Sequence, residues 1–183
     1  MWKWFWDWLA TLPQGSASFV GSLTGSMFGL LSLLLGALYN ARLNRKRDDA
    51  LRAADRIAVA SALYAELQGL HRGLVKNIET LTDMQLNKAF LVPEPSMKIL
   101  PEVLSKIGLL RSETIHKVME AYVLMEQYVG DLILIGGSIR RDMPDTRPMV
   151  ELDSKHAKFV AWLHTVRAGV VKEAIDSIEP YLK

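Results

Sequence analysis

The sequence contains four histidines, whose side chains are the best suited to bind a metal ion or to exchange a proton near neutral pH. They are His71, His116, His156 and His164. No two of them stand four residues apart, as a pair of zinc ligands on one helix does, and the sequence His-Glu-x-x-His does not occur. We therefore predict no metal site and interpret the histidines as surface or helix-capping residues. A two-ligand metal site assembled across helices is the alternative.

The other residue patterns that commonly support catalysis are missing from the sequence. There is no cysteine, which excludes a thiol nucleophile, a disulfide and a thiolate metal site. Gly136 and Gly137 are not followed by the Lys-Ser/Thr of a phosphate-binding loop, and no Gly-x-Ser-x-Gly sequence is present. We predict that the protein is not an enzyme, that it uses no cofactor, and that it has no small-molecule substrate.

An uncharged stretch at residues 17–39 is the strongest feature of the sequence. It holds no Asp, Glu, Lys, Arg or His. A helix of this length spans roughly 35 Å, against about 30 Å of membrane hydrocarbon. We predict an uncleaved transmembrane anchor. The alternatives are a buried helix of a soluble protein and a cleaved signal peptide. A basic cluster follows the apolar run directly, which is typical of a stop-transfer signal.

The charges on either side of this stretch predict its orientation. Only Lys3 and Asp7 precede it, whereas Arg42, Arg45, Lys46 and Arg47 follow it. Cationic residues remain on the cytoplasmic side, so we predict an inner-membrane, single-pass protein with its N-terminus outside and its C-terminal domain in the cytoplasm. The basic cluster would lie at the anionic lipid headgroups. Nearby acidic residues and a net charge of only +2 argue against nucleic acid as a partner.

Tryptophans gather at the N-terminus, at positions Trp2, Trp4, Trp6 and Trp8. The indole ring favours the headgroup level of a membrane, where it is half dry and its N–H is hydrated. We predict that residues 1–16 form an interfacial segment that turns near Pro13 into the membrane span.

Small residues recur inside the span at steps of four, three, four, three and four. They are Ser18, Ser22, Gly25, Gly29, Ser32 and Gly36. Small side chains on one face allow two transmembrane helices to approach closely, and hydroxyl groups can form hydrogen bonds across the contact. We call these six positions the small-residue seam and predict that it mediates self-association or contact with another membrane protein. The alternatives are a pore lined by serine and the ordinary abundance of small residues in membrane spans.

Residues 40–183 predict a helical domain. The span continues as a helix toward Pro93, with an apolar stripe at steps of three, four and seven. The members of that stripe are Leu43, Ala50, Ile57, Leu63, Leu67, Leu70, Leu74, Ile78 and Leu81. Residues 91–101 contain three prolines and predict a loop, and residues 102–110 predict a short helix.

Two further helices are predicted in the C-terminal half. Ser112 is expected to cap a helix that reaches about Ile135 and carries a core stripe including Met119, Tyr122, Met125 and Tyr128. A polar loop follows, whose segment from Arg140 to Arg147 is a candidate partner contact. Asp153 or Ser154 is expected to cap a last helix that ends near Pro180 and carries apolar residues. These are Phe159, Trp162, Leu163, Val166, Val170 and Ile175. No stretch alternates with period two, so we predict no sheet and an all-α fold with a small antiparallel bundle.

Two passages carry a resemblance. They are GALYNARLNRKRDDALRAADRIAVASALYAEL, which starts in the span, and LPEVLSKIGLLRSETIHKVMEAY further on. They resemble uncharacterised bacterial single-span membrane proteins with a cytoplasmic helical domain, and together they cover 55 of the 183 residues. The resemblance implies a bacterial inner-membrane setting, and it brings no activity and no functional residues.

These observations lead to one functional hypothesis and two alternatives. We expect a membrane-anchored interaction or assembly protein that self-associates through its transmembrane helix, with the lipid bilayer and either a homo-oligomer or another membrane protein as partners. The first alternative is a small pore-forming or membrane-perturbing protein. The second is an enzyme or sensor with a polar pocket inside the bundle.

Overall fold

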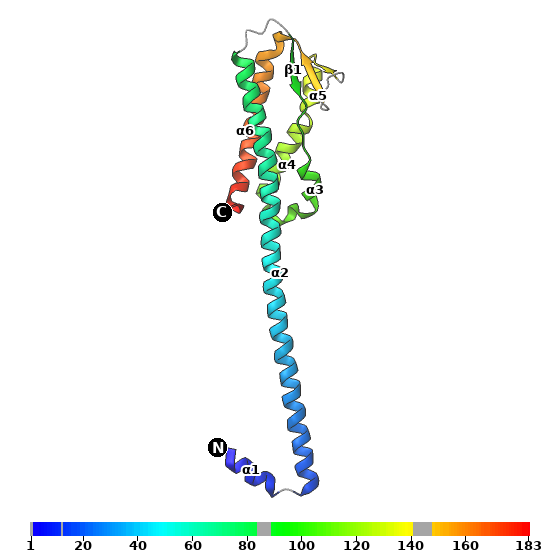
Figure 1. The fold of residues 1–183 in the computed structure, drawn as a ribbon, viewed down its shortest axis with the longest axis vertical. Coiled ribbons are helices and arrows are strands. Elements are labelled where there is room, and N and C mark those ends of the chain that lie inside the picture. The colour runs from blue at the N-terminus through cyan, green and yellow to red at the C-terminus, as the bar shows by residue number, and fades with distance from the viewer. Residues whose placement is uncertain (1, 12, 84–88, 141–147) are drawn as a thin grey trace. The chain divides into compact units, whose positions relative to one another are not determined.

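The computed structural model describes residues 2–11, 13–83, 89–140 and 148–183. The chain is predominantly helical, as predicted, and its helices include a long one near the N-terminus (Figure 1). It divides into two compact units, Met1–Leu51 and Arg52–Lys183. One helix, α2 (Gln14–Asp83), contributes residues to both units.

The N-terminal unit consists of α1 (Trp2–Ala10) and the first part of α2. The predicted break near Pro13 is confirmed, because α1 ends at Ala10 and α2 begins directly after this proline. The hydroxyl of Thr11 donates a hydrogen bond to the Trp8 carbonyl at the end of α1, and the Ser16 hydroxyl donates one to the Pro13 carbonyl. The Trp8 carbonyl is one of the acceptors that the C-terminal end of a helix leaves without an intrahelical partner.

The C-terminal unit is a bundle in which α2 packs with α4 (Ser112–Glu126) and α6 (Ala157–Ile178). Its smaller elements are α3 (Ile99–Val103), η1 (Leu104–Leu109), α5 (Tyr128–Leu134), η2 (Ser154–His156) and η3 (Glu179–Tyr181). The core contains Leu63 and Leu67 of α2, Val118 of α4, and Val171 and Ile175 of α6, all nearly fully buried. Helix burial on this scale is the main source of stability for such a unit.

The predicted apolar stripe of α2 is confirmed only in its second half. Leu63, Leu67, Leu74 and Leu81 are buried, and Leu70 and Ile78 are partly buried. The stripe members Leu43, Ala50 and Ile57 are exposed instead. The apolar periodicity continues along the whole helix. However, α2 contributes residues to the core that it shares with α4 and α6 only from Val59 onward.

A small sheet contradicts the prediction of no β-structure. Strands β1 (Phe90–Pro93), β3 (Met149–Leu152) and β2 (Ser138–Arg140) pair antiparallel in that order. Each strand has only three or four residues, too few to show the alternation by which a strand is recognised in a sequence. Pro93 is tolerated because β1 is an edge strand. The sheet packs Val92 and Val150 against Tyr128, Leu132 and Val160 in a second core cluster.

Several helix boundaries differ from the predictions. The helix expected at residues 102–110 begins earlier, as α3, and continues as η1. Ser112 is the first residue of α4 and makes no capping bond, and the helix expected to reach Ile135 is divided at Gln127. Asp153 caps η2, directly before the last helix: its carboxylate accepts a hydrogen bond from the Lys155 N–H at 3.1 Å, whereas α6 itself begins at Ala157 without a side-chain cap. The segment Arg140–Arg147 was predicted to contact a partner. Only its first residue, Arg140, is among the described residues, and the rest of the segment lies outside them.

The turn after α5 supports a prediction about stability. A Cβ atom added at Gly137 would lie 2.6 Å from both the Leu132 carbonyl oxygen and Val150 Cγ1. We therefore expect Gly137→Ala to lower the free energy of unfolding by about 2–3 kcal/mol, because backbone and a packed strand cannot both move away. Chemical unfolding of the full chain in detergent measures the change. Gly130→Ala in α5 is the matched control, since no atom lies within 4 Å of its Cβ position, and it should be neutral or stabilising.

Candidate functional site

The small-residue seam lies on α2, and all six of its members are exposed. Ser18, Ser22, Gly25, Gly29, Ser32 and Gly36 are each exposed to solvent in the single chain. No atom lies within 4 Å of a Cβ added at Gly25, Gly29 or Gly36. The surrounding apolar side chains are exposed as well, including Leu30 at 70% and Leu33 at 74%. The N-terminal unit therefore presents a helix whose apolar side chains are largely exposed in the single chain.

This helix is long and apolar enough to cross a membrane. Within Ser18–Thr82, an 18-residue window has a mean hydropathy of 1.7, and none of that window is buried. The core helix of a soluble protein would have the window mostly buried. A signal sequence near an N-terminus meets the same criteria of length and composition.

The predicted headgroup residues occupy the two ends of this apolar stretch. Trp2, Trp4, Trp6 and Trp8 all lie in α1, and the side chains of Trp4 and Trp8 are 76% and 45% exposed. The basic residues Arg42, Arg45, Lys46 and Arg47 are exposed on α2. Among the described residues they form no ion pair, so their charges remain available to an anionic surface.

A buried polar cluster in the C-terminal unit escaped the sequence predictions. Arg167 of α6 is only 1% exposed, and its guanidinium forms an ion pair with Asp131 of α5 at 2.5 Å. Its Nε–H also donates a hydrogen bond to the Leu124 carbonyl at 3.2 Å. The guanidinium carbon lies 5.1 Å from the centre of the Tyr128 ring, a distance suited to a cation–π contact. One arginine thus joins α4, α5 and α6.

His164 belongs to the same cluster, and its prediction as a surface or capping residue is wrong. It is completely buried, and its Nε2 forms a hydrogen bond with the Tyr128 hydroxyl. Burial lowers the pKa of His164 to about 4, and the positive charge of Arg167 acts in the same direction. At neutral pH the ring is therefore uncharged.

A signal for this burial was present in the sequence. The buried positions of α6 follow helical spacing and include the two residues that α6 contributes to the polar cluster, His164 and Arg167. They are Ala157, Val160, His164, Arg167, Ala168, Val171, Ala174, Ile175 and Ile178. The larger residues Phe159, Trp162 and Val166 lie on the exposed face instead. Of the other members of the predicted stripe, Ile175 is buried and Leu163 and Val170 are partly buried, so the prediction is wrong for half of its residues. The run of small and β-branched residues marked the buried face.

The remaining histidines are not brought together. His71 and His156 are partly buried, and His116 is exposed. Within the described part of the chain, no group of three or more histidine, aspartate or glutamate residues is arranged to hold a metal ion. The cluster around Arg167 contains a protonated tyrosine and a neutral histidine, both buried, and its geometry suits packing between helices.

Two other polar contacts hold the ends of helices. The Glu66 carboxylate accepts hydrogen bonds from the N–H groups of Lys98 and Ile99 at the start of α3, and from the Tyr122 hydroxyl. Burial, followed by this contact with Glu66, raises the pKa of Tyr122 above its usual value. Through Glu66, α2 therefore supplies the cap of a helix that lies far along the chain.

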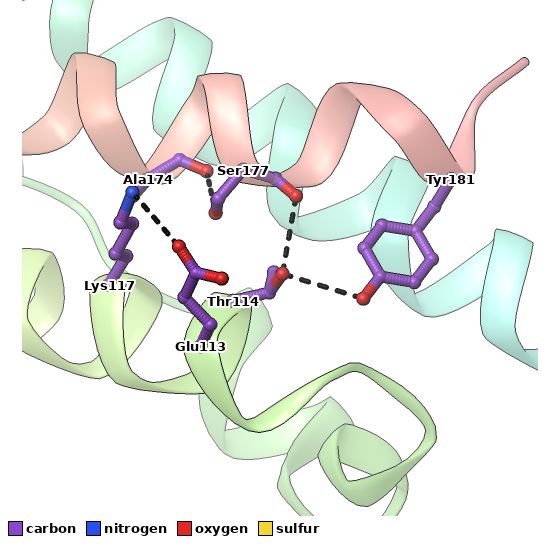
Figure 2. A network of polar contacts seen from close by, with 6 residues as sticks. All are labelled: Glu113, Thr114, Lys117, Ala174, Ser177 and Tyr181. Carbon is purple, nitrogen blue, oxygen red and sulfur yellow. Dashed lines mark hydrogen bonds and ion pairs between the residues drawn. The ribbon is translucent and has the colours of Figure 1, made fainter.

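The start of α4 is held by the C-terminal end of the chain, as Figure 2 shows. The Thr114 hydroxyl donates a hydrogen bond to the Ser177 carbonyl at 3.3 Å and lies 3.4 Å from the Tyr181 hydroxyl. The Arg111 N–H donates to the same tyrosine oxygen at 2.8 Å. An open cavity of about 790 Å³ lies beside this network, and its lining mixes cationic residues such as Arg56 with acidic ones such as Glu173.

Comparison with known protein families, with curated proteins and with solved structures finds no match.

Proposed function

We propose that this chain is a membrane-anchored interaction or assembly protein without catalytic activity, and that it self-associates through its transmembrane helix. The observation that carries the proposal is the small-residue seam, which lies exposed on the uncharged part of α2. In a membrane, helices gain no hydrophobic free energy by associating, so close packing of backbones and hydrogen bonds between hydroxyl groups provide the attraction.

The geometry of the seam suits contact between copies of the chain. Gly25 and Gly29 lack side chains, which allows a second helix to approach their backbones closely. Ser22 and Ser32 flank them and bring hydroxyl groups to the same contact. All copies insert with the same orientation, so their seams run parallel and face one another in register.

The flanking residues support the proposed orientation. The exposed cations Arg42, Arg45, Lys46 and Arg47 match the headgroups of an anionic leaflet, and each contributes roughly 1 kcal/mol of attraction near such a surface. Exposed Trp4 and Trp8 suit the opposite interface. We propose an inner-membrane protein with its N-terminus outside and residues 52–183 in the cytoplasm.

The C-terminal unit carries a second exposed run of small residues on α2. Ala54, Ala58, Ser61 and Ala65 are all exposed and follow steps of four, three and four. The buried face of the same helix contains Leu63 and Leu67, so these small side chains point away from the bundle. This arrangement supports a function in protein contact rather than in chemistry.

Substitutions in the seam test the proposal. We expect Gly25→Leu and Gly29→Leu to raise the dissociation constant of the oligomer at least about tenfold, because leucine side chains separate the helix backbones. Size-exclusion chromatography with light scattering, on full-length protein in detergent and nanodiscs, measures the oligomeric state. Met27→Phe and Leu34→Phe add bulk on the opposite face and should leave it unchanged. A monomeric wild type, or equal effects from both pairs of variants, would contradict self-association through the seam.

A pore-forming or membrane-perturbing protein is the second candidate, favoured by the serine hydroxyls of the seam and the exposed tryptophans of α1. Release of a fluorescent dye from vesicles that contain the purified protein distinguishes the two functions. Dye release that depends on Ser22 and Ser32 would favour the pore, whereas intact vesicles with a stable oligomer would favour the assembly protein.

A further inference from the structure

A small cavity lies where the end of α2, strand β1 and α6 meet. Its volume is about 50 Å³. Asn77, Thr80 and Leu81 of α2 line it, together with residues 90–92 of β1 and His164 of α6. Two of these three elements bring polar side chains, so the cavity differs from an apolar packing defect, which stays dry.

His164 has one ring nitrogen that the described protein atoms leave unpaired. Its Nε2 contacts the Tyr128 hydroxyl, whereas Nδ1 is buried and has no hydrogen-bond partner among the described residues. A buried polar atom without a partner is unfavourable, typically by more than the net contribution of one hydrogen bond, and native structures rarely retain one. The ring therefore needs a partner on its Nδ1 side.

The contact with Tyr128 determines which kind of partner is needed. Tyr128 is almost fully buried and keeps its proton, so its O–H needs an acceptor. His164 Nε2 is the acceptor that the structure provides. The proton of the neutral ring then resides on Nδ1, which makes Nδ1–H a buried donor in search of an oxygen atom.

We propose that the cavity is a binding site for ordered water, in which a water molecule accepts a hydrogen bond from His164 Nδ1–H and is held by Asn77 and Thr80. The space is sufficient, because one water needs at least about 10–15 Å³. The Thr80 hydroxyl donates to the Lys76 carbonyl at 2.9 Å, and its oxygen can still accept a hydrogen bond from the water. The Asn77 amide offers both a donor and an acceptor.

Asn77 also gives the site a route of exchange. The same residue lines an open groove of about 400 Å³ between α2 and the segment Pro93–Ser96, together with Gly73 and Tyr128. The Asn77 side chain is partly buried and borders both spaces. The cavity itself is partly open, because the exposed residues Thr80 and Leu91 belong to its lining, so its water can exchange with the solvent. This inference does not depend on the proposed function of the membrane helix.

A matched pair of substitutions tests the proposal. Thr80→Val and Thr82→Val remove the same hydroxyl from the same helix end, where Thr82 donates to the Ile78 carbonyl at 2.8 Å but does not line the cavity. If water occupies the cavity, Thr80→Val removes one of its partners and should raise the unfolding equilibrium constant of the full chain several-fold more than Thr82→Val does. Asn77→Leu should raise it roughly tenfold. If the cavity is dry, Asn77→Leu fills it and should be neutral or stabilising, which would overturn the proposal.

Nuclear magnetic resonance of the wild-type chain in nanodiscs provides an independent test that no folding defect can disturb. With ¹⁵N-labelled histidine, the His164 signals, assigned by their loss in His164→Gln, should show a protonated Nδ1 and an unprotonated Nε2. The Nδ1 proton should give a cross-peak to a long-lived water. A proton on Nε2, or a contact from Nδ1 to a protein carbonyl in place of water, would contradict the site.

Discussion

Between pH 7 and pH 4, the unit Arg52–Lys183 is expected to lose about 3 kcal/mol of its free energy of unfolding through one residue, His164. The pKa of His164 is lowered from 6.5 to about 4 in the folded protein, first by burial and then by the charge of Arg167. In this pH range the unfolded chain binds a proton at His164 and the folded chain does not. Stability therefore stays constant above pH 6.5 and falls as the pH drops from 6.5 toward 4.

The described surroundings of His164 offer no charge that would offset this loss. The groups that face it are the Tyr128 hydroxyl, which is protonated, and the Arg167 guanidinium, which is positive. Asp131 is already paired with that arginine. A second positive charge at His164 would thus be buried beside the first.

Hydrogen exchange of the backbone amides of α4 and α6, measured on the full chain in detergent across this pH range, reports the effect. His164→Gln keeps a polar side chain of similar length that does not titrate, so the variant should be less stable at pH 7 and should have a much shallower pH dependence. Equal slopes for wild type and His164→Gln would show that other groups, such as exposed carboxylates, cause the acid sensitivity.

Removal of Asp131 is expected to destabilise the same unit by about 3 kcal/mol. Asp131→Ala leaves the guanidinium of Arg167 buried without its counter-ion, and only the Leu124 carbonyl and the Tyr128 ring remain as partners among the described residues. The Asp131 side chain is 42% exposed, so water screens part of the attraction, and the expected effect lies at the low end for a buried ion pair.

The reverse substitution should have a smaller effect. Arg167→Met keeps much of the buried volume and removes the charge that needs a partner, so we expect a loss of about 1–2 kcal/mol. The double variant should resemble Arg167→Met alone, because Asp131 then has no charge to neutralise. This non-additivity is the expected signature of a direct contact.

Denaturant unfolding of the four proteins, with Asp176→Ala as a control, checks this prediction. Asp176 pairs with Lys172 on the surface of α6, where both side chains are about half exposed, so its removal should have little measurable effect. If Asp131→Ala and Asp176→Ala behave alike, or if the two changes in the double variant simply add, the buried pair does not contribute in the way proposed.

The exposed features of this protein could be predicted from local sequence patterns. The uncharged stretch of α2 and the register of its small residues depend only on composition and on the 3.6-residue repeat of a helix. The helix break at Pro13 and the Asp153 cap depend on the chemistry of single residues. In the interior, the burial of Tyr122 and Met125 in α4 could also be predicted, because large apolar residues on one face of a helix favour burial.

The tertiary structure alone decided the sheet and the buried polar contacts of the C-terminal unit. Strands β1, β2 and β3 exist because residues distant in the sequence pair and cover Leu132 and Tyr128, and segments of three or four residues have no such preference by themselves. The burial of His164 and Arg167 likewise depends on partners from other elements, the hydroxyl of Tyr128 and the carboxylate of Asp131. A polar side chain can be buried only where another segment satisfies it, and a local pattern carries no information about which segment will be there.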